Sequence, residues 1–190
     1  NRTQDLLVGH ALEDISVAVK AAGSMLRQIV TTRDEDVLFL AATPPIQGML
    51  RSRSGEMSDF EDSDKYPQWA VRLESIFASQ LKRKSSYLSL RFIDREGYEL
   101  VHVRSKESGL IVYQGDELQN KIGRTYVRET LKLPAGSIYV SEINLNREYG
   151  MVVEPHQEVL RSATPVYDEQ SGELAGLVVV TARIDRELHA

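Results

Sequence analysis

Leu160-Arg-Ser-Ala-Thr-Pro-Val-Tyr167 and Gly176-Leu-Val-Val-Val180 are the two segments that decide the fold. Both have the short apolar and β-branched pattern of strands, and the polar residues 168–173 between them are typical of a hairpin connection. Arg161 nevertheless stands among apolar neighbours, and Tyr139 and Ser141 share one face of an earlier short strand. A strand that only builds a core needs none of these polar groups. We therefore expect a small polar molecule to lie against this sheet.

The composition is ordinary for a globular protein, with 190 residues of which 42% are apolar and 27% charged. This is enough chain for one domain, or for one domain with an appended helical element. The net charge of −5 argues against nucleic-acid binding through phosphate contacts. The absence of cysteine excludes disulfides, thiol catalysis and thiolate metal sites. No apolar run reaches the roughly 18 residues of a membrane-spanning helix.

The sequence has no motif typical of an enzyme. A phosphate loop, a Gly-x-Ser-x-Gly elbow and a His-x-x-x-His pair are all missing. His156-x-Glu158 is similar to a fragment of the deaminase zinc motif, but the cysteines that this motif needs do not exist here. We expect neither catalysis nor a metal or cofactor.

The N-terminal part is predicted to be helical. Residues 5–33 form one long helix in this prediction, with an apolar heptad seam made of Val8, Leu12, Ile15, Val19, Ala22, Leu26 and Ile29. The seam suits either a homodimer through this helix or a single broad stripe facing the core. A second helix is expected from about Asp34 until Thr43-Pro-Pro45 interrupts it, with a short helix afterwards. Pro67 suits the first turn of a third helix.

From residue 86 the apolar pattern changes to a period of two, which is typical of strands. The predicted strands are 86–94, 98–104, 137–141, 158–167 and 174–184. A hairpin turn is expected at Arg95-Glu-Gly97, a loop over 105–115 and a helix over 117–131. This order predicts an α+β fold in which one antiparallel sheet of about five strands packs on the long N-terminal helix.

Strand alternation divides the predicted sheet into an aliphatic and a polar face. The aliphatic face receives Leu88, Leu90, Phe92, Val101 and Val103. The polar face receives Tyr87, Ser89, Arg91, Tyr98, His102, Arg104, Tyr139 and Ser141. Such a face is either solvated, as antiparallel sheets allow, or the wall of a pocket. Repeated tyrosine and arginine favour a pocket, and two arginines in it favour a carboxylate-like anion.

Several pieces of the sequence stand in a distinctive order between about residues 86 and 183. They are Leu90-Arg-Phe-Ile-Asp-Arg-Glu-Gly97, Leu118-Gln-Asn-Lys121 with Tyr126, Gly136-Ser-Ile-Tyr-Val-Ser141, Asn144-Leu-Asn-Arg-Glu148, and Arg161-Ser-Ala-Thr-Pro-Val166 with Gly176. In this order they resemble the extracytoplasmic Cache sensor domains of bacterial transmembrane receptors, whose PAS-like sheet stands behind a long N-terminal helix. The resemblance is greatest to the membrane-distal module of double Cache receptors on histidine kinases, diguanylate cyclases and chemoreceptors.

This resemblance implies a ligand site between the sheet and the helix and loops that cover it. Its implied border is Arg91, Tyr126, Tyr139, Ser141 and Arg161, to which strand alternation adds Tyr87 and His102. Asn144, Asn146 and Glu148 lie in the adjacent connection, where they would support the loop. The aromatic and acidic pattern of the amino-acid-binding branch is not matched. Residues 67–190 would be the sensor module, and residues 1–66 the long helix with a helical and loop extension.

The sequence thus predicts a periplasmic ligand-sensing domain of a membrane-anchored receptor of the histidine kinase or diguanylate cyclase type. It would bind a small anion, and any catalytic output would lie in a cytoplasmic part. We expect truncation of Arg91 or Arg161 to weaken ligand binding while leaving the fold intact. The alternative is a protein-interaction or dimerisation module without a small-molecule ligand.

Overall fold

A computed structural model describes residues 2–54, 65–154 and 156–184. Contacts divide the chain into two compact units, residues 1–33 and residues 34–190. The sequence suggested a boundary at residue 66 instead. Residues 34–54 belong with the sheet because they contribute to its main core, in which Val37, Leu40, Ile46 and Met49 are fully buried.

The N-terminal helix α1 runs without a break from Arg2 to Ala41. The separate helix predicted from Asp34 is therefore wrong, because no glycine or proline lies between residues 24 and 43 to interrupt the hydrogen-bond ladder. Within the predicted heptad seam, Ile15 and Val19 are 59% and 65% exposed in the single chain. The other five seam side chains lie outside the described ones. The homodimer through this helix stays a prediction.

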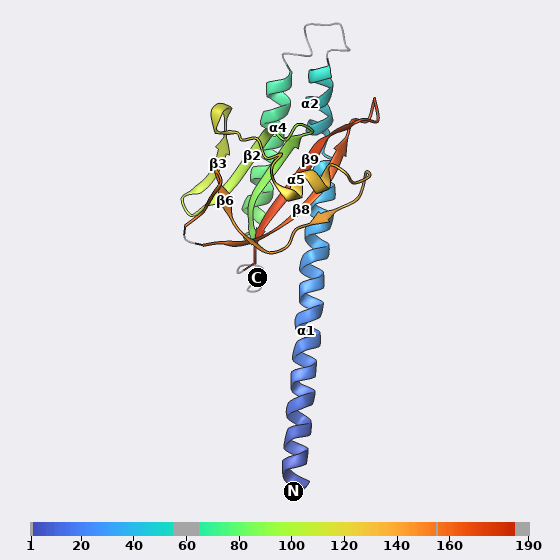
Figure 1. Cartoon of the computed structure of the whole chain (residues 1–190), viewed down its shortest axis with the longest axis vertical. Helices are drawn as coiled ribbons and strands as arrows, with labels where there is room; N and C mark the ends of the chain where they lie inside the picture. The colour runs from blue at the N-terminus through green and yellow to red at the C-terminus, as the bar shows by residue number, and fades with distance from the viewer. Residues whose placement is uncertain (1, 55–64, 155, 185–190) are drawn as a thin grey trace. The chain divides into compact units, whose positions relative to one another are not determined.

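Helices α2 (Pro44–Ser54) and α4 (Tyr66–Arg83) lie on one face of the sheet, together with the end of α1 (Figure 1). They confirm the short helix expected after Thr43-Pro-Pro45 and the helix expected to begin at Pro67. The two helices approach closely at Gly48, since an added Cβ there would lie 2.4 Å from the Trp69 ring. Trp69 thereby packs against the main core.

The sheet has seven antiparallel strands in the order β3-β2-β1-β9-β8-β4, and β5 also pairs with β8. Its long strands are β1 (Tyr87–Asp94), β2 (Glu99–Lys106), β3 (Gly109–Tyr113), β8 (Glu158–Tyr167) and β9 (Leu174–Arg183). The short strands are β4 (Tyr139–Val140) and β5 (Asn144–Leu145), and β6 (Arg147–Glu148) pairs with β7 (Met151–Val152) in a separate hairpin. The predicted α+β fold with an antiparallel sheet is confirmed. Four predicted strands correspond to β1, β2, β8 and β9, and the one at 137–141 shortens to β4.

Two predictions between residues 105 and 131 are wrong. The expected loop contains β3, which pairs with β2 from Gly109 to Tyr113. The expected helix shortens to a 3-10 turn η1 (Gly115–Glu117) and the helix α5 (Thr125–Thr130). Residues 118–121 between them are not helical, because the Lys121 amide donates to the Gly97 carbonyl and the Gln119 carbonyl accepts from the Glu99 amide, and a turn follows at 122–124. A helix would need those groups for its own ladder.

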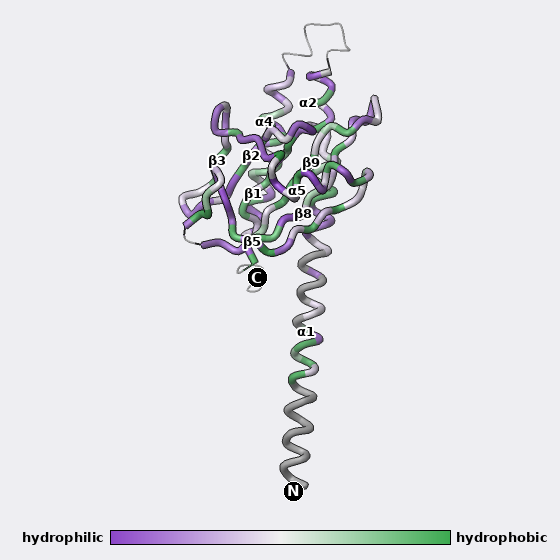
Figure 2. Tube along the Cα trace, viewed as in Figure 1, coloured by the Kyte–Doolittle hydropathy of each residue, from purple (hydrophilic) through white to green (hydrophobic). Residues whose placement is uncertain are grey.

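The two faces of the sheet carry different chemistry. The helix-covered face holds Leu90, Phe92, Val101 and Val103 in the main core, as the strand alternation predicted. The other face holds a small apolar cluster that includes Ile93, Val127 and Val179, beneath α5. Figure 2 shows apolar residues along the central strands and hydrophilic residues in the connections.

Tyr87 does not share the polar face, and that prediction is wrong. A β-bulge between Tyr87 and Ser89 inserts one residue and so reverses the direction of Tyr87. Its ring packs in the helix-facing core, and its hydroxyl bonds to the carboxylate of Asp36 on α1 at 2.5 Å. Tyr87 thus ties the end of α1 to the sheet.

None of the helices in the described part of the chain is both long and apolar enough to cross a bilayer. Among the described residues, no group of three or more His, Asp or Glu side chains is arranged to hold a metal ion.

Candidate ligand-binding site

A cavity of about 720 Å³ opens on the face of the sheet that the long helices leave free. Its walls are the sheet strands β1 and β8, the start of α5, and the connection from β4 to β6. The lining side chains are Arg91, Lys121, Arg124, Thr125, Tyr126, Tyr139, Val140, Ser141, Glu142, Asn144, Leu145, Arg147 and Arg161. Five of them are cations and one is a carboxylate. The cavity therefore brings together Arg91, Tyr126, Tyr139, Ser141 and Arg161, which the sequence had grouped.

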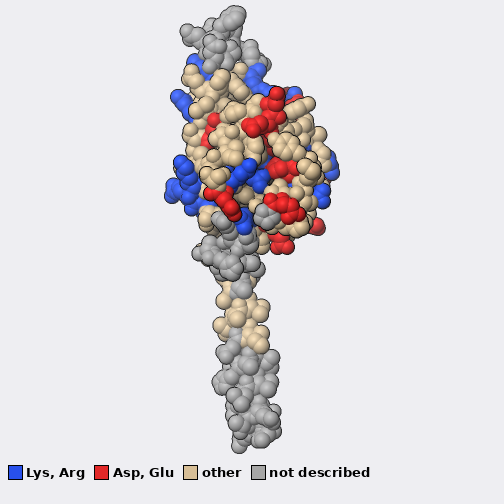
Figure 3. Space-filling view, turned by 90° about the vertical axis from the view of Figure 1, so that its left-hand side faces the viewer, with Lys and Arg blue, Asp and Glu red and all other residues tan. Residues whose placement is uncertain are grey.

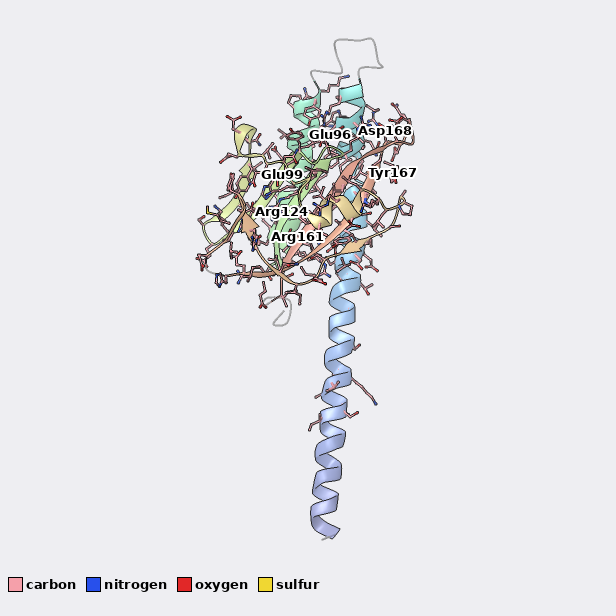
Figure 4. The ribbon with its side chains drawn as sticks, viewed as in Figure 1. Glu96, Glu99, Arg124, Arg161, Tyr167 and Asp168 are labelled. Carbon is pink, nitrogen blue, oxygen red and sulfur yellow. The ribbon has the colours of Figure 1, made fainter. Side chains whose placement is uncertain are left out.

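Arg161 on β8 presents a half-buried guanidinium to this cavity. It lies over the Tyr126 ring, 5.3 Å from the ring centroid, in a cation–π contact. No described carboxylate forms an ion pair with it. Burial lowers the pKa of Arg161, and repulsion from Arg91 and Arg124 lowers it further. In Figure 4 the labelled Arg124 and Arg161 lie near each other beside α5, whereas Glu96, Tyr167 and Asp168 lie at the other end of the strands.

The hydroxyl groups on the cavity wall fall into two kinds. The phenols of Tyr126 and Tyr139 donate no hydrogen bond to any described residue, and burial raises the pKa of Tyr126. The hydroxyl of Ser141 is already engaged: it donates to the Glu142 carbonyl at 2.8 Å and accepts from the Arg161 amide at 3.0 Å. Ser141 therefore joins β4 to β8, while the two tyrosines are available to a bound molecule.

Arg91 on β1 is held by two carboxylates. Its Nε donates to Glu99 at 2.8 Å, and an Nη atom donates to Glu148 at 2.8 Å. A second Nη atom donates to the Ser89 hydroxyl at 2.8 Å. Burial opposes the charge of this guanidinium, but Glu148 and Glu99 outweigh that effect and raise the pKa of Arg91. Arg91 borders the cavity, but its donors are satisfied within the protein.

Glu148 on β6 is the acceptor at the centre of this charged group. Besides Arg91, its carboxylate accepts from Arg104 at 3.0 Å and from Lys121 at 3.4 Å. Burial raises the pKa of Glu148, and the cations Arg91 and Lys121 reverse the direction so that the net pKa is lowered. The sequence assigned Glu148 a local loop-supporting role. Its contacts instead tie the β6–β7 hairpin to strands β1 and β2 and to the segment before α5.

The two asparagines of the same connection make local contacts. Asn144 donates to the Glu142 carbonyl at 2.9 Å. Asn146 is buried and donates through its backbone to the Gln157 carbonyl at 2.8 Å and through its side chain to the Gln157 amide oxygen at 3.2 Å. These bonds support the interpretation that both residues shape the loop.

His102 lies on the polar face, as predicted, but outside the cavity lining. Its buried ring stacks on Tyr113, with ring centroids 4.3 Å apart, and its Nδ1 is 3.5 Å from Glu99. Burial and the charge of Arg91 lower the pKa of His102 to about 4, so the ring is neutral at ordinary pH. Neither ring nitrogen has a hydrogen-bond partner in the described structure. His102 is thus part of the packing beneath the charged group.

Sequence reasoning missed several charged residues of this face. Lys121, Arg124 and Arg147 line the cavity, and Glu99 belongs to the charged group around Arg91. Arg104, which was expected on the polar face but not in the site, belongs to that group too. Alternation places Arg104 beside Arg91 on the sheet, whereas Arg124 immediately precedes α5 and Arg147 lies in the two-residue strand β6, which is too short to show a period. Figure 3 shows the result from the side of β3 and β6: Lys and Arg atoms lie among Asp and Glu atoms on one surface.

An antiparallel sheet covered by helices on one face, with a polar cavity on the other, is the architecture of a PAS-like sensor domain. Residues 49–186 match the family model of the bacterial histidine kinase sensor domain. Since this match covers well over half of the chain, the chain belongs to that family. No curated protein matches the sequence significantly.

Solved sensory domains share this fold. The extracellular domain of vpHK1S-Z8, classed as a histidine kinase, has a TM-score of 0.68 and 21% sequence identity. The similarity covers 94% of this chain and 57% of the vpHK1S-Z8 chain. A domain of a sensory box/GGDEF family protein from Vibrio parahaemolyticus has a TM-score of 0.67 and 21% identity, over 92% of this chain and 59% of its own. The chain thus spans slightly more than half of these structures.

A third similar structure is the ligand-binding domain of the Campylobacter jejuni chemoreceptor Tlp3, in complex with 4-methylisoleucine. Its TM-score is 0.61 and its identity 15%, over 88% of this chain and 56% of its own. The family and these structures confirm the resemblance to extracytoplasmic Cache sensor domains.

Proposed function

We propose that this chain is the ligand-sensing domain of a bacterial transmembrane receptor, located outside the cytoplasm, and that it binds a small anion in the cavity beside Arg161. The family supports a sensor without catalytic activity of its own. One observation carries the anion: the guanidinium of Arg161 is half buried, faces a cavity and has no carboxylate partner among the described residues. Burying an unpaired cation costs free energy. An anion that enters the cavity can form with Arg161 the charge-assisted hydrogen bonds that no described carboxylate forms.

Sensing requires that the ligand bind one arrangement of the domain better than another. The connection from β4 to β6 contributes Tyr139, Ser141 and Arg147 to the cavity wall, so a ligand there contacts both this connection and the sheet. Strand β8, which carries Arg161, pairs with the last strand β9 and bonds through Ser162 to Asp34 of α1. A change in the cavity can therefore act through these direct contacts on α1 and β9, the elements that lead towards the two chain ends. In the full receptor these segments would lead to the membrane and to a cytoplasmic output domain, which we propose to be a histidine kinase or a diguanylate cyclase.

A thermal-shift screen of the purified domain tests the proposal. Small carboxylates, phosphate, amino acids, polyamines and purines are added to the wild type and to the Arg161→Gln variant. A ligand stabilises the folded state by mass action, so a concentration-dependent rise in Tm is expected for anions. The rise should vanish in Arg161→Gln and persist in Arg83→Gln, a matched control at the exposed end of α4. A rise equal in both variants would refute the site.

A second candidate function is dimerisation through residues 5–33. The observation that favours it is the exposure of Ile15 and Val19, which stand four residues apart on one helix face. Sedimentation equilibrium of the whole chain would detect the dimer. Replacing both residues with glutamate should shift the protein to monomer if the seam is the interface. A dimer unchanged by this replacement would exclude the seam.

A further inference from the structure

The five cations of the cavity are not equivalent, because the protein neutralises only some of them. Arg91 and Lys121 share the carboxylates of Glu99 and Glu148, at distances between 2.8 and 3.9 Å. Arg124, Arg147 and Arg161 form no ion pair with any described residue, although all three line the cavity. Among the described residues that line the cavity, Glu142 alone carries a carboxylate, and it is exposed, as Arg147 is. The cavity thus keeps an excess of positive charge after every internal pairing.

The three unpaired guanidiniums come from separate parts of the wall. Arg161 belongs to β8, Arg124 immediately precedes α5, and Arg147 belongs to β6. A carboxylate binds a guanidinium fork with its two oxygens, so one carboxylate satisfies one fork well and leaves the others with unused donors. A cavity of about 720 Å³ also exceeds what a single small carboxylate fills.

An ammonium group finds little to bind in the same cavity. Glu99 accepts from Arg91 and from the Gln119 amide, and Glu148 accepts from Arg91, Arg104 and Lys121. Both carboxylates are therefore occupied by protein donors, which leaves the exposed carboxylate of Glu142 as the remaining one among the described lining residues. Tyr126 and Tyr139 can offer phenol donors that suit an anion. A zwitterion would place its positive group among cations.

From this division between paired and unpaired cations we infer that the ligand carries at least two negative groups, as a dicarboxylate, a tricarboxylate or a phosphorylated carboxylate does. Zwitterionic amino acids are excluded from this ligand class. One negative group pairs with Arg161 at the sheet, and another pairs with Arg124 or Arg147 at the wall formed by the connections. This inference rests on the proposed function and names the ligand class of the same site.

The test compares ligands that differ by one charge and little else. Succinate and glutarate are titrated against their monoamides, succinamate and glutaramate, and against glutamate, by calorimetry on the wild-type domain. Tricarballylate and 3-phosphoglycerate extend the series, so that the carboxylate and phosphate arms are measured separately. Loss of one charge-assisted contact should weaken binding by roughly 10- to 100-fold, so each monoamide should bind that much less tightly than its dianion.

Variants locate the second negative group. Arg124→Gln and Arg147→Gln are titrated with the dianion and its monoamide, with Arg83→Gln as the charge-matched control. At least one of these two variants should bind the dianion roughly tenfold less tightly than wild type and bind the monoamide almost equally well. Arg161→Gln should bind both ligands less tightly. Equal binding of dianion and monoamide, or tighter binding of glutamate, would overturn the ligand class while leaving a sensor that depends on Arg161. If no compound binds in a way that depends on Arg161, the proposed function is overturned as well.

Discussion

Two groups of cations lie on the same face of one sheet, and they differ in what surrounds them. Arg91, Arg104 and Lys121 are buried and share the carboxylates of Glu99 and Glu148. Arg124, Arg147 and Arg161 border the open cavity and have no ion-pair partner among the described residues. We call the first the paired group and the second the open group. The residue types are nearly the same in both, so the difference lies in pairing.

The comparison teaches that an arginine at a cavity wall is not by itself a ligand contact. The sequence treated Arg91 and Arg161 as equivalent, since both interrupt apolar strands. In the structure Arg91 stabilises the fold by neutralising the buried carboxylate of Glu99 and the partly buried one of Glu148, and Arg161 remains available. We therefore no longer expect Arg91 to be replaceable without damage to the fold.

The largest expected effect is that of Arg91→Ala. It leaves the buried carboxylate of Glu99 without its nearest cation, and breaking a buried ion pair on one side costs about 3–5 kcal/mol. Urea denaturation should show the loss in the free energy of unfolding. An unfolding free energy within about 1 kcal/mol of wild type would place Arg91 with the open group instead.

His102 and the two carboxylates of the paired group should also make stability depend on pH. Burial keeps His102 neutral in the folded state and lowers its pKa to about 4, whereas the unfolded chain takes up a proton at about 6.5. Between these two pKa values the unfolded state binds more protons than the folded state. The contribution of His102 to the free energy of unfolding is therefore complete above about pH 6.5 and is lost as the pH falls towards 4, by at most about 3 kcal/mol. Below about pH 4.3, protonation of Glu99 and Glu148, whose pKa values are lowered, removes more. Denaturation curves across this range measure the slope, and His102→Gln should flatten it above pH 4.5. An unchanged slope in that variant would assign the effect to another group.

Glu148→Gln should have an intermediate effect. Hydrogen bonds to charged groups contribute about 1.5–3 kcal/mol, and this change weakens several that converge on one carboxylate. Amide hydrogen exchange should accelerate in residues 147–152 before the rest of the sheet responds, because Glu148 ties that hairpin down. Glu142→Gln is the control, since Glu142 is exposed on the same connection. Equal exchange in both variants would show that Glu148 does not hold the hairpin.

The smallest effect on stability is expected from Arg161→Gln. Its guanidinium has no ion pair to lose and its burial disfavours the charge, so the free energy of unfolding without ligand should stay within about 0.5 kcal/mol of wild type or rise. The same variant should lose the ligand response. A loss of more than about 2 kcal/mol would show that Arg161 has a structural role like that of Arg91.

Much of the fold follows from short patterns. Pro67 predicted the start of α4, Gly97 predicted the hairpin between β1 and β2, and the apolar period of two predicted β8 and β9. Each of these depends on neighbours within a few residues. The run Gly109-Leu-Ile-Val-Tyr113 is also short, apolar and bounded by glycine, which is typical of a strand, although it lies within the predicted loop 105–115.

Other features depended on contacts that no local pattern contains. The segment 118–122 has polar and apolar residues at spacings that suit a helix, yet its backbone bonds to the turn at Gly97. A β-bulge between β1 and β9 turns Tyr87 away from the face predicted for it. The cavity residue Arg124 follows the segment held at Gly97, and Arg147 lies in strand β6, which Glu148 ties to Arg91 and Arg104.

By itself, the sequence determined the classes of element, the two faces of the long strands and the presence of arginine and tyrosine on one of them. These follow from backbone periodicity, which is a property of consecutive residues. Only the tertiary structure decided which arginines are neutralised. Arg91 meets Glu148 across 57 residues of chain, and Arg161 meets no carboxylate at all among the described residues. Ionic interactions depend on distance in space and on burial, and neither quantity can be read from the order of residues along the chain.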